Sequence, residues 1–111
     1  MILGVGDVYV QVPHRQVAER AMQAAREHAL AQDGCLGFVF AEVMADPGHF
    51  VVLESWSDQQ AVEQHYGSPG YADYQRTIAP LLVHDSEYRL HVVAETLHPV
   101  DTRTIVTDQD D

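Results

Sequence analysis

The hydrophobic pattern of this 111-residue chain changes its period several times, and the order of these changes limits the possible folds. Apolar side chains alternate with a period of two over residues 2–12, 35–43, 49–56 and 87–97, which predicts strands. Residues 14–32 and 57–78 instead carry apolar side chains at helical spacing, with a break at 67–70. The predicted order is strand, helix, strand, strand, helix, strand.

Residues that favour turns and helix ends stand where the period changes. Pro13 suits the first turn of a helix, and Gly34 suits a left-handed residue at a helix end. Residues 46–48 read Asp-Pro-Gly, which predicts a hairpin turn. Ser57, with Gln60 three residues later, predicts a capping box. The first helix is expected to bury one stripe, which is flanked by Ala18, Met22 and Ala29. The stripe itself consists of Val17, Ala21, Ala24, Ala25 and His28.

This order is that of the ferredoxin-like β-α-β-β-α-β unit, an α+β fold with an antiparallel four-stranded sheet and helices on one face. Gly4 and Gly6 share a face of the first strand and leave room there for a close neighbour. Other strand residues are apolar on both faces, and one set must lie on the uncovered face: Val5, Val51, Leu53 and Val93. An uncovered apolar face predicts a homodimer in which two sheets pack face to face.

The charge balance excludes several functions. Seventeen acidic residues stand against six arginines, there is no lysine, and the formal net charge is −11. Nucleic-acid binding and a polybasic membrane site both need a basic surface that this chain lacks. Schiff-base chemistry and pyridoxal phosphate anchoring need a lysine amine. We therefore expect neither nucleic acid nor membrane as a partner.

Cysteine use and the amino terminus add further limits. Cys35 is the only cysteine, so no intrachain disulfide and no cysteine-rich metal site can form. The first residues lack the basic region of a signal peptide, and no apolar run approaches the length of a membrane span. A cytoplasmic location is the expectation.

The seven histidines do not follow the spacing of a metal site. There is no His-x-His and no His-Glu-x-x-His motif. Gly4 and Gly6 lack the third glycine of a dinucleotide-binding fingerprint, because Tyr9 stands in its place. We expect no metal.

Aromatic residues gather near the end of the third strand and in the second helical region. Trp56, His65, Tyr66, Tyr71 and Tyr74 could rim a pocket for a flat phenolic or quinone ligand. The alternative is that Trp56 and Tyr71 are core residues and that His65 is solvated. Two further side chains complete the candidates: Glu54 shares the strand face of Trp56, and Arg76 either binds an anion or pairs with Asp73.

Three short motifs at their mutual distances resemble the antibiotic biosynthesis monooxygenase family of small quinol monooxygenases over residues 1–98. They are Gly-Cys-Leu-Gly-Phe at 34–38, Glu-x-Trp at 54–56 and Ser-Pro-x-Tyr at 68–71. The resemblance implies a dimeric α+β barrel with a pocket in each subunit. It also implies that a phenol or dihydroquinone reacts with O2 without metal, flavin, other cofactor or added reductant.

The resemblance assigns residues one by one. Some oxidising members carry an asparagine four residues before the tryptophan, where this chain has Val52, and Arg76 matches their pocket arginine. A haem-ligating histidine of a related branch has no counterpart at 71–76. His65 is the expected proton acceptor, because an unperturbed histidine titrates near neutrality. The expected catalytic set is His65, Trp56 and Arg76, and the expected substrate-binding set is Phe50, Val52, Glu54, Tyr71 and Tyr74.

We thus expect a cofactor-independent monooxygenase that acts with O2 on a small phenolic or hydroquinone-type aromatic substrate. Two alternatives remain open: a non-oxidative binding or cyclase-type module of a biosynthetic pathway, and a homodimer that only binds a hydrophobic metabolite. Residues 1–98 are expected to form the single domain. Residues 99–111 are rich in aspartate and are expected to form either a mobile acidic tail or an arm clasped by the partner subunit through Ile105 and Val106.

Overall fold

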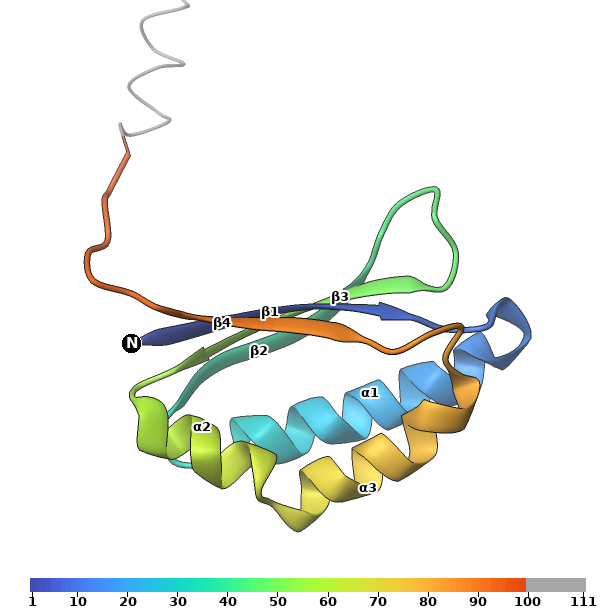
Figure 1. The fold of residues 1–111 in the computed structure, drawn as a ribbon, viewed down its shortest axis with the longest axis horizontal. Helices are drawn as coiled ribbons and strands as arrows, with labels where there is room; N and C mark the ends of the chain where they lie inside the picture. Colours follow the sequence, from blue (N-terminus) through green and yellow to red (C-terminus); the bar gives the residue numbers. More distant parts are fainter. Residues whose placement is uncertain (100–111) are drawn as a thin grey trace, which may run out of the picture.

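The structure is a computed structural model, and it describes residues 1–99. One sheet contains four strands: β1 (Ile2–Tyr9), β2 (Cys35–Glu42), β3 (His49–Trp56) and β4 (Glu87–Val92). The α-helices lie together on one face of this sheet (Figure 1): α1 (Arg15–Leu30), α2 (Gln59–Tyr66) and α3 (Pro69–Ile78). Short 3-10 helices, η1 (Val12–His14) and η2 (Ala79–Leu81), precede α1 and follow α3. The predicted ferredoxin-like α+β fold is confirmed.

The sheet is antiparallel, with the strand order β2-β3-β1-β4. Gly4 of β1 lies opposite Glu54 of β3, and Gly6 lies opposite Val52. On the other side of β1, Gly6 lies opposite Tyr88 of β4. Because side chains alternate between the faces of a strand, this register places Glu54, Val52 and Tyr88 on the face that the helices cover.

The two glycines of β1 provide the space that the sequence predicts. A Cβ atom on Gly4 would lie 2.5 Å from Cγ of Glu54, and one on Gly6 would lie 2.6 Å from the ring of Tyr88. Both distances are far below van der Waals contact. Any side chain at these positions would therefore displace Glu54 or Tyr88, which both line the cavity described below.

Two apolar clusters fill the space between sheet and helices. The first surrounds Trp56, which is fully buried, and includes Phe38, Val52 and Val62. The second surrounds Ile78 and includes, among others, Val8, Met22, Phe50 and Tyr74. Full burial of each large apolar side chain contributes roughly 1.5–3 kcal/mol to folding, so these clusters hold the helices on the sheet. Phe40 and Tyr88 pack against both clusters.

Several boundaries differ from the sequence-based expectations. The N-cap of α2 is Asp58, whose side chain accepts a hydrogen bond from the backbone nitrogen of Ala61, so the prediction of Ser57 was wrong. Asp58 is in an extended conformation, which directs its carboxylate at the first turn. Ser68 caps α3 in the same way. β1 and β4 end earlier than predicted, at Tyr9 and Val92.

The buried stripe of α1 is the predicted flank rather than the predicted centre. Ala18, Met22 and Ala29 are buried, whereas Val17 is 40 % exposed and Ala24 is exposed. Val17 and Ala24 instead border a groove of about 500 Å³ between α1 and α3. The runs of alanine made neighbouring stripes equally apolar, and packing against both sheet and α3 selected one of them.

The sheet face away from the helices is rich in exposed apolar side chains. Leu53 is 50 % exposed and lies between Val5 of β1 and Val39 of β2, which is 44 % exposed. Leu3 continues this surface on β1 and is 39 % exposed. The uncovered face is therefore present in the single chain.

Across residues 1–99, none of the helices is both long enough and apolar enough to cross a membrane. The expectations for the acidic tail, including a clasp through Ile105 and Val106, concern residues that lie outside the described range.

Candidate active site

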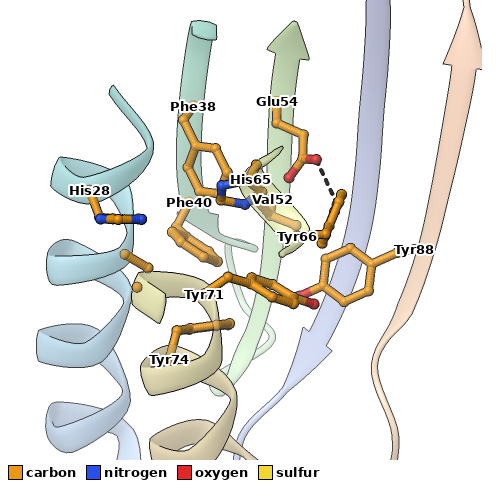
Figure 2. Close-up of a pocket in the computed structure, with 12 residues that line it drawn as sticks. His28, Phe38, Phe40, Val52, Glu54, His65, Tyr66, Tyr71, Tyr74 and Tyr88 are labelled. Carbon is orange, nitrogen blue, oxygen red and sulfur yellow. Dashed lines mark hydrogen bonds between the residues drawn. The ribbon is translucent and has the colours of Figure 1, made fainter. Parts of the chain in front are cut away.

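A cavity lies where the two apolar clusters meet, between the sheet and the three helices (Figure 2). Its volume is about 10 Å³, which is room for about one water molecule. Its polar lining consists of Glu54, four tyrosines and two histidines; the tyrosines are Tyr66, Tyr71, Tyr74 and Tyr88, and the histidines are His28 and His65. The remainder is apolar or glycine: Ala25, Phe38, Phe40, Val52 and Gly70.

Glu54 brings the only carboxylate to this lining and is 4 % exposed. Its Oε1 atom accepts hydrogen bonds from Nε1 of Trp56 at 3.2 Å and from the hydroxyl of Tyr66 at 2.6 Å. Burial, and then the bond to Glu54, raise the pKa of Tyr66, so that hydroxyl keeps its proton and remains a donor. The two donors compensate part of the cost of burying a polar carboxyl group.

His65 is the titratable group at the centre of the aromatic residues and is 3 % exposed. Its Nδ1 atom lies 2.7 Å from Oε1 of Gln32, and its ring centroid lies 4.7 Å from that of Trp56. Burial, with a smaller contribution from nearby His28, lowers the pKa of His65 to about 4. The ring is therefore neutral at pH 7, with the Nδ1 proton donated to Gln32 and the lone pair on Nε2.

The tyrosines of α3 form the opposite wall. The ring of Tyr71 lies 5.4 Å from that of His65 and 6.4 Å from that of Tyr74, so it stands between them. The Tyr71 hydroxyl accepts a hydrogen bond from Nε2 of Gln75. The Tyr74 hydroxyl is buried beside that of Tyr88, and no acceptor lies at normal hydrogen-bond distance from it in the described part of the chain. Burial raises the pKa of Tyr74, and it raises that of Tyr88 to about 12.

His28 and Gly70 stand between this cavity and the groove outside α1 and α3, because both residues line both spaces. Nε2 of His28 donates to the hydroxyl of Ser68 at 3.1 Å. A Cβ atom on Gly70 would lie 2.3 Å from Cδ2 of His28, so Gly70 lets the imidazole lie flat against the start of α3.

The structure brings together most of the residues predicted for the site. Six of them line the cavity: Val52, Glu54, His65, Tyr66, Tyr71 and Tyr74. Trp56 is fully buried behind the lining, where it contacts both Glu54 and His65. The open alternative of a solvated His65 does not hold, because this side chain is buried.

Two predicted residues lie elsewhere. Arg76 is exposed on α3 and pairs with Asp73, which is one of the two outcomes that the sequence predicts for it. It follows Tyr74 by two residues, about 200° around the helix, so it points away when Tyr74 points inward. Phe50 shares the inner face of β3 but packs in the second apolar cluster, beyond the cavity lining.

Sequence reasoning missed several contributors from distant segments. They are Tyr88 of β4, His28 of α1, Gln32 in the turn after α1 and Phe38 of β2. The room left by Gly6 was the available signal for Tyr88, but only the strand pairing shows which side chain fills it. The segments on either side of α1 carry no motif that singles out Gln32.

Among residues 1–99, no three or more His, Cys, Asp or Glu side chains are grouped so that they could hold a metal ion. Cys35 is half-buried near the cavity, and its burial raises the thiol pKa. This thiol is therefore a poor nucleophile at neutral pH.

Two curated proteins are similar in sequence. "Uncharacterized protein sll1783" of Synechocystis is 22 % identical over 95 residues, which cover 86 % of this chain and 65 % of that protein. "Putative monooxygenase Rv0793" of Mycobacterium tuberculosis is 36 % identical over 52 residues, which cover 47 % of this chain and 50 % of that protein. This chain thus matches less than two thirds of the length of each relative.

Solved structures share the fold. The structure of Rv0793 from Mycobacterium tuberculosis has a TM-score of 0.80 and 22 % identity, covering 87 % of this chain and 98 % of that chain. A crystal structure described as an antibiotic biosynthesis monooxygenase has a TM-score of 0.80 and 19 % identity. The match covers 86 % of this chain and 100 % of that chain. The crystal structure of PA3566 from Pseudomonas aeruginosa has a TM-score of 0.77 and 20 % identity. The match covers 85 % of this chain and 94 % of that chain.

Sequence and fold therefore agree. Residues 1–77, which include β1 to β3, α1, α2 and most of α3, match the family described as antibiotic biosynthesis monooxygenase. This match spans well over half of the chain, and it contains His65, Glu54 and Trp56. The chain belongs to the antibiotic biosynthesis monooxygenase family.

Proposed function

We propose that this protein is a cofactor-independent monooxygenase that oxidises a phenolic or hydroquinone-type aromatic substrate with O2. The observation that carries the proposal is a buried, neutral histidine in an aromatic cavity, held by Gln32 through Nδ1 with the lone pair of Nε2 available. Membership of the monooxygenase family supports the same reaction class. The substrate itself would supply all the electrons.

The proposed reaction balances without an added reductant. A phenol with a free para position and one O2 give a para-quinone and one water. A hydroquinone with a free ring position and one O2 give a hydroxyquinone and one water in the same way. The para C–H bond and the phenolic O–H bond break, and one oxygen atom becomes the new carbonyl. The other oxygen atom leaves as water with the two hydrogens, and the ring loses four electrons to the four-electron reduction of O2.

In this proposal the protein supplies binding, desolvation and one proton acceptor. Nε2 of His65 accepts the phenolic proton, which makes the ring more electron-rich before it meets O2. Tyr71 holds the ring, while Trp56 supports His65 from behind. The largely apolar surface of the cavity keeps most water away from the ionised substrate.

The low pKa of His65 limits which phenols can react. Full transfer of a proton from a phenol with a pKa of about 10 to a group with a pKa of about 4 costs roughly 8 kcal/mol. A phenol that is acidified by its own substituents reduces this cost. The proposed substrate is therefore an acidic phenol rather than a simple one.

The small cavity also requires motion during binding. Its volume of about 10 Å³ cannot hold an aromatic ring, so side chains must rotate when substrate enters. The wall made by His28 and Gly70 separates the cavity from the large outer groove. We propose this groove as the access route.

A homodimer is part of the proposal. The face that carries Leu3, Leu53 and Val39 is apolar and exposed in the single chain. Packing against a second copy would remove that surface from water.

The test is O2 uptake by the chelator-treated protein with a panel of naphthols and hydroquinones of differing acidity. The expected result is one O2 consumed per quinone formed, with one atom of ¹⁸O2 in the product and one in water. His65→Ala should reduce turnover by about 100- to 10,000-fold, as loss of a general base does. Ligand binding without O2 uptake across the panel would contradict the oxygenase and favour the non-oxidative binding or cyclase-type alternative. Activity that returned only with one particular added metal would contradict cofactor independence.

A further inference from the structure

Four residues form the wall between the cavity and the groove outside α1 and α3. Within residues 1–99, the side chains or backbone that line both spaces belong to Ala25, His28, Gly70 and Tyr74. Ala25 and Gly70 have no side chain that could swing aside. Tyr74 is 5 % exposed and belongs to the second apolar cluster, so its displacement would disturb the core. Of these four residues, His28 is therefore the one that can move without unpacking the fold.

The imidazole of His28 is held through the hydroxyl of Ser68. This hydroxyl donates its proton to the carbonyl oxygen of His65 at 2.6 Å, so it accepts from Nε2 of His28, which lies 3.1 Å away. The same oxygen accepts from the backbone nitrogen of Tyr71 and thereby caps α3. Release of His28 would leave the cap and the bond to His65 in place. Water from the groove can replace the bond that is lost, because His28 is only half-buried.

The groove has room for a displaced ring. Side chains on a helix lean toward the preceding turn, so the imidazole of His28 lies over the residues three and four positions earlier. These are Ala25, which borders both spaces, and Ala24, which borders the groove but not the cavity. Figure 2 shows His28 on α1, at the margin of the lining side chains. Rotation about χ1 would carry the ring from the cavity side of α1 to the groove side, over a methyl group.

Gly70 makes the inward position of the ring possible. A Cβ atom on Gly70 would lie 2.3 Å from Cδ2 and 2.4 Å from Nε2 of His28. Gly70 belongs to the first turn of α3, and it is not one of the glycines with a positive φ, Gly34 and Gly48. The imidazole, rather than the backbone conformation, therefore requires a glycine here. An alanine at this position would exclude the inward ring and leave the outward position free.

Other parts of the lining also separate the cavity from outer hollows. Phe40 borders a hollow of about 250 Å³ between α1 and β2, while Tyr71 and Tyr88 border one of about 370 Å³ between α3 and β4. All three rings pack against the buried apolar clusters. Their movement would expose core side chains to water, whereas movement of His28 uncovers an alanine and a glycine.

We propose that His28 is the entry gate of the cavity: its imidazole rotates outward over Ala24, and a ligand then passes from the groove over Gly70 into the cavity. The inference rests on the proposed function only for the kind of molecule that enters, an aromatic substrate. The gate itself belongs to the wall and needs no turnover. With the ring in its outward position, the cavity and the groove form one continuous space.

The experiment uses Trp56 as an internal probe, because it is the only tryptophan of the chain. Its side chain is fully buried, and its ring centroid lies 4.7 Å from that of His65, which lines the cavity. Acrylamide is a small neutral quencher, and the fluorescence lifetime of Trp56 at rising acrylamide concentration gives the rate constant of collisional quenching. His28→Ala should raise this constant about 5- to 10-fold, the change in the open population that loss of one net hydrogen bond produces.

Gly70→Ala should raise the quenching constant by a similar factor, because its new methyl group displaces the inward ring. The double variant should show no further increase, since both changes abolish the same position. Gly67→Ala is the matched control: it adds a methyl group at the end of α2, where the closest atom is the carbonyl oxygen of Glu63, and should change nothing. Ala24→Leu should lower the constant, because leucine fills the space that the outward ring needs.

Three results would overturn the inference: unchanged quenching in His28→Ala, a further increase in the double variant, or unchanged or faster quenching in Ala24→Leu. Loss of the folded circular dichroism spectrum in His28→Ala would also contradict it, because a gate is dispensable for the core. Failure of the proposed function is separate, since no substrate is present. Faster quenching in His28→Ala, found in a protein without O2 uptake, would support the gate and refute the oxygenase. O2 uptake with quenching that ignores His28 would do the reverse.

Discussion

Nδ1 of His65 lies 2.7 Å from Oε1 of Gln32, so a residue in the turn after α1 determines which nitrogen of a histidine on α2 carries the proton. An amide oxygen can only accept a hydrogen bond, which places the proton on Nδ1 and the lone pair on Nε2. Nε2 is the nitrogen proposed to meet the substrate. Gln32 is therefore a positioning residue for the proposed proton acceptor.

Replacing Gln32 by glutamate should move the pH dependence of turnover. His65 acts in its neutral form, so activity should fall as pH drops through its pKa of about 4. A carboxylate beside Nδ1 favours the imidazolium and raises this pKa. The acid limb of kcat/KM in Gln32→Glu should therefore lie at higher pH than in the unmodified protein. Gln32→Met is the control, because it removes the acceptor without adding charge. An acid limb that stayed in place in Gln32→Glu would contradict the role of His65.

Gly4→Ala should destabilise the protein and disturb Glu54. The new Cβ atom would lie 2.5 Å from Cγ of Glu54, and that side chain is held by Trp56 and Tyr66. Overpacking of this kind typically costs about 1–3 kcal/mol of unfolding free energy. Gly37→Ala is a matched control, because the closest atom to its Cβ would be the Ser55 hydroxyl at 3.2 Å. Denaturant unfolding of both variants checks the prediction, and equal stability would show that Glu54 is free to move.

Leu53→Asp should convert the proposed homodimer into a monomer or cause aggregation. Leu53 lies at the centre of the exposed apolar sheet face, and an aspartate buried there would be an unpaired charge. Val17→Asp is the control, since Val17 is an exposed apolar residue at the groove between α1 and α3. Sedimentation of the unmodified protein should show a dimer. A stable monomer at all concentrations measured would refute the dimer.

His49 should contribute to stability in a pH-dependent manner. Its Nε2 atom lies 2.8 Å from Oδ1 of Asp7, and its Nδ1 atom lies 2.9 Å from Oδ2 of Asp46. Only a protonated imidazole donates from both nitrogens, and the bond to Asp7, followed by that to Asp46, raises the pKa of His49. This contribution is fully present below the unfolded pKa of about 6.5 and is lost as pH rises through the higher folded pKa.

The measurement is the melting temperature of the unmodified protein minus that of His49→Gln, at constant protein concentration and across pH. The difference should be largest on the acidic side and should shrink as pH rises through the folded pKa of His49. A difference that grew with pH would mean that the neutral ring makes the stabilising contacts.

Arg76→Met should leave turnover unchanged within about twofold, because substitutions at exposed positions usually change free energies by less than about 0.5 kcal/mol. Arg76 pairs with Asp73 on the outer side of α3 and does not line the cavity. Steady-state kinetics on any accepted phenol would check this expectation. A large loss of kcat would restore the role that the resemblance assigned to this arginine.

The order of elements and the general position of the cavity could be predicted because they depend on local signals. Alternation at 49–56 predicts a strand whose inner face carries Val52, Glu54 and Trp56, and β3 has those boundaries. Helical spacing similarly places Tyr71 and Tyr74 on one side of α3. Such patterns identify a face without knowledge of what packs against it.

Other features depend on which distant segments meet. The alanine-rich α1 offers several equivalent apolar stripes, so only its packing decided that Ala18 and Met22 are buried and that Val17 is not. The hydrogen bond between His65 and Gln32 joins side chains 33 positions apart in the sequence. The position of the Tyr88 ring over Gly6 follows from the pairing of β1 with β4.

By itself the sequence determined periodicity, turn chemistry and charge, because each is a property of neighbouring residues and of composition. The tertiary structure decided the protonated nitrogen of His65 and the burial of the Tyr74 hydroxyl, because both depend on contacts between elements. The tertiary structure also places the Arg76 side chain on the exposed side of α3, where it pairs with Asp73. Burial, which sets the pKa of His65, exists only when those elements are packed together.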